Sequence, residues 1–97
     1  MTWIRTIPLA EADEDLQRRY QAVYSLYPPE YGVEVPAVVD PATGAADSVV
    51  ASHSLISRAM EHALSTYGTL LSDELPLTRR QHEMIATVVS ALNRCFY

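Results

Sequence analysis

Apolar residues recur every three or four positions in three parts of the chain, the spacing that places side chains on one face of a helix. In the first part, Leu16, Tyr20, Val23 and Tyr27 follow one another at intervals of four, three and four residues. Acidic residues crowd the start of this segment, where carboxylates favour the positive end of the helix dipole. Two prolines then follow, and a proline disfavours helical geometry in the residue before it. We therefore predict a helix over residues 13–27.

The middle of the chain passes from turn-forming residues to a second helical pattern. Residues 31–46 hold two glycines and two prolines among several valines. Because prolines count against a strand, this segment is predicted to be a loop with one helical turn around Ala37–Asp40. A helix is predicted over residues 48–71, with an interruption near Ser54. Its predicted buried stripe is Ile56, Met60, Ala63, Tyr67 and Leu70, supported by Leu64 and Leu71.

The third amphipathic segment follows a linker at residues 72–76. Thr78 and Gln81 have the spacing of a capping box, in which each side chain accepts a hydrogen bond from a backbone N–H of the other residue. A helix is therefore predicted over residues 78–93. Its predicted buried face is Met84, Ile85, Val88, Val89 and Leu92. The chain as a whole is predicted to be all-α, with residues 1–97 forming one helical domain.

Composition narrows the class of protein. The chain has 97 residues, of which 48% are hydrophobic and 20% are charged, and its net charge is −5. An acidic chain argues against nucleic-acid binding, which requires a basic patch to neutralise phosphates. No stretch reaches the roughly 20 apolar residues of a membrane span, and the first residues do not form a signal peptide. A single cysteine excludes an internal disulfide framework, so we expect a cytoplasmic protein without membrane contact.

The three histidines do not indicate a metal site. His53 and His62 are nine residues apart and His82 lies in another predicted helix, so no pair has the spacing of two ligands on one helical face. They are interpreted as surface or capping residues, and no metal and no cofactor are expected. Ser52-His53-Ser54 lacks the Gly-x-Ser-x-Gly turn of a hydrolase.

Glu83 and Cys95 are the candidate catalytic residues. They are twelve positions apart, which on one straight helix means about 18 Å at about 1.5 Å per residue. A continuous helix therefore cannot bring the carboxylate to the thiol. Asn93 tolerates the left-handed conformation that ends helices, so a break at residues 93–94 is expected. Cys95 would then begin a new helix that folds back, where the helix dipole favours a thiolate.

Residues 77–97, LTRRQHEMIATVVSALNRCFY, resemble the core of the alkyl hydroperoxidase D-like proteins. These belong to the carboxymuconolactone decarboxylase superfamily, and the resemblance is to its peroxidase-related branch. The family pattern is a glutamate, eleven residues, and then Cys-x-x-Cys-x-x-x-His, and Glu83 and Cys95 match its first two elements. Looser similarity covers Ile7-Pro8, the first helix and His53-Ser54-Leu55. The resemblance implies that residues 1–97 are the N-terminal part of such a domain and end inside the Cys-x-x-Cys motif.

The resemblance also implies an activity. Family members of the thiol branch reduce hydroperoxides through a dithiol–disulfide cycle, with electrons from a thioredoxin-like or lipoyl-type donor, and they assemble as trimers or hexamers. Glu83 would be a partly buried base near Cys95, and Cys95 one member of the redox pair. The family generally gives the attacking role to the second cysteine, which would make Cys95 the resolving thiol. The 97-residue chain alone is expected to be inactive. Two alternatives stay open: a decarboxylase-like lyase, and a non-catalytic helical oligomerisation module.

Overall fold

The computed structural model describes residues 3–32, 35–42 and 48–95. Three α-helices occupy them: α1 (Glu14–Tyr24), α2 (Ser57–Leu70) and α3 (Arg79–Leu92). Short 3-10 helices lie between and before them, namely η1 (Leu9–Glu11), η2 (Pro29–Gly32), η3 (Pro36–Val38) and η4 (Ala51–Ile56). This part of the chain contains no β-strand, so the all-α prediction is confirmed. The loop predicted over residues 31–46 carries its helical turn at η3, while residues 33–34 and 43–46 lie outside the described part.

Helix α1 buries the face that the sequence predicts. The Asp13 side chain caps it by accepting a hydrogen bond from the backbone N–H of Leu16 at 2.8 Å. Such a cap contributes about 1 kcal/mol. Leu16, Tyr20 and Val23 are all buried, and Val23 is completely inaccessible. The helix ends at Tyr24, three residues before the predicted end.

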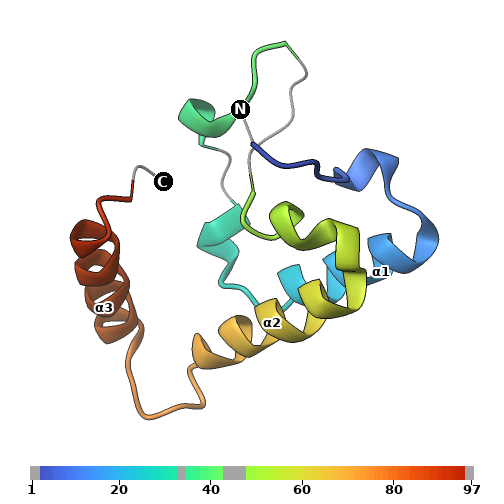
Figure 1. Cartoon of the computed structure of the whole chain (residues 1–97). Coiled ribbons are helices and arrows are strands. Elements are labelled where there is room, and N and C mark those ends of the chain that lie inside the picture. The colour runs from blue at the N-terminus through green and yellow to red at the C-terminus, as the bar shows by residue number, and fades with distance from the viewer. Residues whose placement is uncertain (1–2, 33–34, 43–47, 96–97) are drawn as a thin grey trace.

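Helix α2 lies beside α1 (Figure 1), and it buries the predicted residues Met60 and Leu64 but not the rest of the predicted stripe. The buried residues are Met60, Leu64 and Gly68, whereas Tyr67 and Leu70 are exposed. At about 100° per residue, the two faces differ by roughly 80° around the axis. Ile56 is also exposed, so this part of the prediction was wrong.

The reason for the rotation is the close approach, at Gly68, of the segment that follows α1. A Cβ atom at this position would lie 2.7 Å from the Cβ of Leu26, a distance that real side chains do not tolerate. The glycine therefore faces the segment that follows α1, and Met60 and Leu64 follow it onto the same side. The predicted interruption lies at Ile56, two residues after Ser54, where η4 ends and the backbone leaves helical geometry (φ −126°, ψ 77°).

The N-terminal segment is tied to this two-helix body by polar contacts. The hydroxyl of Tyr20 donates to the carbonyl of Ile7 at 2.7 Å, and the backbone N–H of Ile7 donates to the Oγ of Ser54 at 2.7 Å. Both Tyr20 and Ser54 are buried. Because a buried polar group without a partner costs about 1–3 kcal/mol, these two bonds fix where the segment lies.

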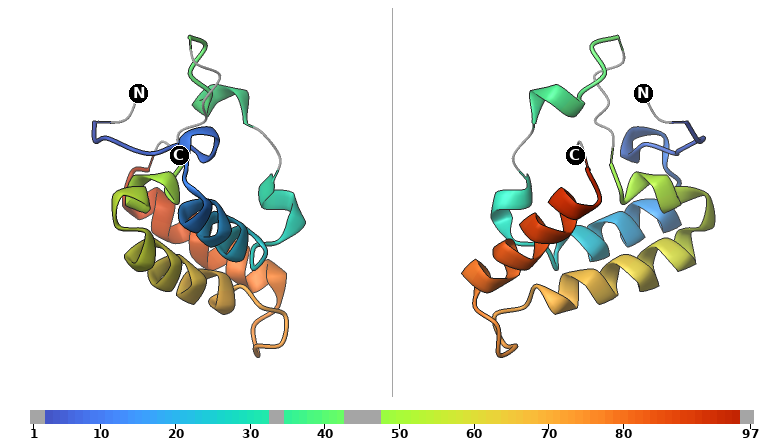
Figure 2. Two further views of the ribbon diagram at one scale, coloured as in Figure 1. Left: turned by 90° about the vertical axis from the view of Figure 1, so that its right-hand side faces the viewer. Right: turned by 60° about the vertical axis from the view of Figure 1, so that its left-hand side comes forward.

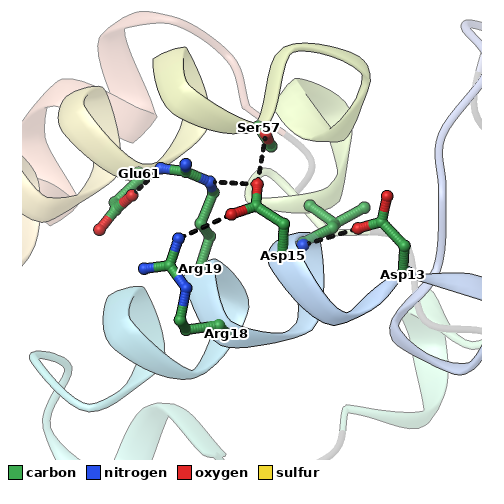
Figure 3. Close-up of polar contacts among 7 residues, drawn as sticks. Asp13, Asp15, Arg18, Arg19, Ser57 and Glu61 are labelled. Atoms are coloured by element: carbon green, nitrogen blue, oxygen red, sulfur yellow. Dashed lines mark hydrogen bonds and ion pairs between the residues drawn. The ribbon is translucent and has the colours of Figure 1, made fainter.

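An ion cluster on the rim links α1 to α2 (Figure 3). Asp15 accepts from Arg18 and from Arg19, each at 2.7 Å, and Arg19 also pairs with Glu61 of α2. Ser57 at the start of α2 contacts Asp15 at 3.4 Å. The hydrogen bonds from Arg19 and Arg18 lower the pKa of Asp15 to about 2.

Helix α3 is set apart from the two-helix body. It follows the linker after α2, which is visible in both views of Figure 2, and Figure 1 shows it apart from the α1–α2 pair. Its apolar side chains, which the sequence pattern assigns to a buried face, are exposed instead: Met84, Ile85, Val88, Val89 and Leu92 are each at least half accessible. That prediction was wrong for this chain, since no described element lies against this face.

Candidate functional site

Helix α3 carries Glu83, and Cys95 follows its C-terminal end. The start of α3 is built as the sequence predicts. Thr78 is the N-cap, and its side chain accepts from the backbone N–H of Gln81 at 3.3 Å. Gln81 in turn accepts from the backbone N–H of Thr78 at 2.8 Å. This confirms the capping box, which fixes the register of the helix and so the direction in which Glu83 points.

Glu83 lies in a three-residue cluster with Arg79 and Tyr31. Its Oε1 accepts a hydrogen bond from the Nε of Arg79 at 2.7 Å and another from the hydroxyl of Tyr31 at 3.1 Å. The guanidinium of Arg79 also lies over the Tyr31 ring, 4.8 Å from its centroid. The Glu83 side chain is 47% exposed. The carboxylate is thus held by two donors and remains open to solvent.

Cys95 lies immediately outside α3 and is exposed. The N–H of Cys95 donates to the carbonyl of Ser90 at 2.9 Å, and the N–H of Arg94 donates to the carbonyl of Ala91 at 3.1 Å. These two bonds form the Schellman motif that ends a helix. The left-handed residue is Arg94, with φ 52°, while Asn93 keeps helical geometry (φ −78°). The break was predicted at the right place, but the assignment of its left-handed conformation to Asn93 was wrong.

The described residues do not bring Glu83 and Cys95 together. Leu92 lies nine positions after Glu83, which is about 14 Å along the axis at about 1.5 Å per residue. The new helix expected at Cys95 cannot be followed, because residues 96–97 lie outside the described part. The proximity of the two groups therefore stays a prediction.

His82 is buried, against the interpretation of the histidines as surface or capping residues. It is 8% exposed, and its Nδ1 has no hydrogen-bond partner in the described part of the chain. It borders two pockets, of about 520 and 480 Å³. The larger lies between the end of α2, the linker and α3, and Leu70, Leu77 and Val89 contribute to its mainly apolar walls. The apolar face of α3 thus borders an open hollow instead of a packed core.

His53 and His62 are exposed, and His53 contacts the carbonyl of Val49 through its Nδ1 at 2.9 Å. No group of three or more histidine, cysteine or acidic side chains within the described ranges is placed to hold a metal ion. Across the same residues, no helix is long and apolar enough to cross a membrane.

Comparisons of the chain with protein-family models, with curated proteins and with solved structures found no match. The functional interpretation therefore depends on the residues of α3 and on their surroundings.

The two residues that contact Glu83 differ in how far the sequence could have identified them. Arg79 is four positions before Glu83, a spacing at which opposite charges meet on one helix, so this contact was readable. Tyr31 is 52 residues away from Glu83 in the chain, and no local rule connects the two. The contact exists because η2 places Tyr31 beside the first turns of α3.

Proposed function

We propose that this chain carries part of a thiol-dependent peroxidase of the alkyl hydroperoxidase D-like type, with Cys95 as one redox thiol and Glu83 as the acid–base group. The observation that carries the proposal is the end of α3. The Schellman motif places Cys95 outside the helix and exposed, at the point where a chain that brings a thiol back toward Glu83 has to turn. The spacing of Glu83 and Cys95, which resembles that family, supports the same proposal.

The proposed reaction balances as follows. A thiolate attacks the terminal oxygen of a hydroperoxide, which carries the hydrogen, so that an S–O bond forms, the O–O bond breaks and an alkoxide leaves. The thiol proton, taken by the Glu83 carboxylate, passes to the alkoxide and yields the alcohol. A second thiol then attacks the sulfenic acid, forming a disulfide and releasing water. A dithiol donor of the thioredoxin or lipoyl type restores both thiols by exchange.

The test requires a second thiol, which the family pattern places three positions after Cys95. We therefore consider a version of the chain extended by this cysteine and by a histidine four positions beyond it. It should turn over cumene hydroperoxide with dithiothreitol as donor. Glu83→Gln should lower turnover about 100-fold, the usual scale of acid–base help. Glu74→Gln, an exposed acid in the linker, is the matched control.

Unchanged turnover in Glu83→Gln would make Glu83 a structural residue and contradict the proposal. The 97-residue chain has one cysteine and so cannot form an intramolecular disulfide. We predict that it shows no catalytic turnover and that oxidation links it into dimers through Cys95.

We further propose that the protein forms a homo-oligomer, a trimer or hexamer, through α3. The support is the exposed apolar face of this helix, which includes Ile85, Val88 and Leu92. Contiguous apolar patches on proteins in water usually mark interaction sites.

A further inference from the structure

We propose that Tyr31 and Arg79 are positioning residues for Glu83: together they hold one carboxylate oxygen and leave the other to exchange protons. The inference rests on the proposed role of Glu83 and adds two residues to that site. Neither Tyr31 nor Arg79 is part of the Glu83–Cys95 spacing from which the function was inferred.

Both donors bind the same oxygen of the Glu83 carboxylate. The Nε of Arg79 and the hydroxyl of Tyr31 both reach Oε1, at 2.7 and 3.1 Å. Among the described residues, no hydrogen-bond donor reaches Oε2. A proton can therefore arrive at or leave Oε2 of Glu83 without breaking either of the bonds that orient the carboxylate. A general base needs this combination of fixed direction and a free lone pair.

The two donors are themselves fixed. The Arg79 guanidinium lies 4.8 Å from the centroid of the Tyr31 ring, within the range of a cation–π contact. The Tyr31 ring meets Tyr27 edge-on at 6.2 Å, and Tyr27 meets Tyr67 of α2 edge-on at 5.8 Å. Such aromatic pairs contribute about 0.5–1.5 kcal/mol each. The direction of the Glu83 carboxylate is thus set from the α1–α2 body through a chain of packed rings.

Both donors keep their protons over the pH range of thiol chemistry. Burial, followed by the hydrogen bond to Glu83, raises the pKa of Tyr31 to about 12, with the charges of Tyr67 and Glu83 acting in the same direction and that of Arg79 against them. Arginine stays charged throughout. The hold on Oε1 therefore persists when the thiol ionises.

A titration of Tyr31 in the 97-residue chain tests the hydrogen bond to Glu83 independently of any catalytic activity. The ring Cζ carbon of Tyr31, assigned by its loss in Tyr31→Phe, is followed by NMR as the pH is raised. Glu83→Gln should move its titration to lower pH, because the hydrogen bond to Glu83 is one of the causes that raise the pKa of Tyr31. Glu30→Gln, an exposed acid beside Tyr31 in the sequence, should leave it unchanged. An identical Tyr31 titration in the native chain and in Glu83→Gln would overturn the proposal.

Turnover of the extended chain tests the consequence for catalysis. Tyr31→Phe should lower kcat by about 10-fold to 100-fold, the cost of a misdirected group. Arg79→Lys should recover part of the activity that Arg79→Gln loses. Tyr24→Phe, whose hydroxyl contacts only the Oγ of Ser48 among the described residues, is the control.

The outcomes separate the two proposals. If Glu83→Gln leaves turnover unchanged, the proposed function fails, and the titration of Tyr31 still decides whether the hold exists. If Glu83→Gln lowers turnover but Tyr31→Phe leaves kcat unchanged, the positioning proposal fails and the proposed function stands.

Discussion

Single side chains in this protein act mainly by accepting hydrogen bonds at helix ends and between helices. Asp13 and Thr78 cap α1 and α3, and Glu83 joins α3 to η2 through Tyr31. Each of these hydrogen bonds replaces one that the backbone or carboxylate group would otherwise make to water. The positive φ of Arg94 is the exception. This conformation costs a non-glycine residue about 1–2 kcal/mol and is tolerated here because two backbone bonds close the helix.

Asp15 gives a residue-scale prediction about pH. Its pKa is lowered to about 2 in the folded chain by hydrogen bonds from Arg19 and Arg18. A lowered folded-state pKa means that the stabilisation is present above the ordinary value of 3.8 and is lost as the pH falls toward 2. Asp15→Asn should therefore flatten the fall of the urea midpoint between about pH 4 and pH 2. Glu14→Gln in the same turn should leave the slope as it is. Parallel slopes in the native chain and in Asp15→Asn would contradict the prediction.

At the scale of elements, the packing of α1 against α2 forms the body of the fold. Gly68 determines how closely α2 approaches the segment that follows α1. Gly68→Ala improves intrinsic helix propensity by about 1 kcal/mol. The added Cβ, however, would lie 2.7 Å from the Cβ of Leu26, and overpacking costs about 1–3 kcal/mol. The clash should win, so we expect a lower free energy of unfolding in chemical denaturation. Ala63→Gly, on the exposed side of α2, calibrates the propensity alone. A stabilised Gly68→Ala would show that the helices separate easily.

At the scale of the whole molecule, the exposed apolar face of α3 is the surface through which we propose that the chains associate. We predict that sedimentation in the tens of micromolar range shows a species larger than a monomer. Val88→Lys should return it to the monomer without loss of helix signal, because Val88 contributes little to the core of one chain. Thr87→Lys, one position away and off the apolar stripe, should leave the assembly intact. A native chain that sediments as a monomer at these concentrations would contradict the oligomer proposal.

Sequence alone predicted what depends on near neighbours. The face of α1, the capping box of α3 and the place where α3 ends follow from residues within one or two turns of each other, and each was found where expected. Met60 and Leu64 of the predicted α2 stripe are buried, but most of its other members are exposed because the phase of the helix depends on where Leu26 approaches Gly68. The predicted burial of α3 was wrong because an apolar stripe shows which face of a helix favours burial, but not whether another element packs against that face. Tyr31 was missed because its contact with Glu83 spans 52 residues.

The most direct test of the central claim is the redox state of Cys95 in the extended chain after one equivalent of cumene hydroperoxide, measured by peptide mass spectrometry. The account predicts a disulfide within one chain between Cys95 and the cysteine three positions later, reversed by a dithiol. Such a bond requires Cα atoms about 4.4–6.8 Å apart. A Cys95 that stays a free thiol, or that pairs only with the Cys95 of another chain, would contradict the account.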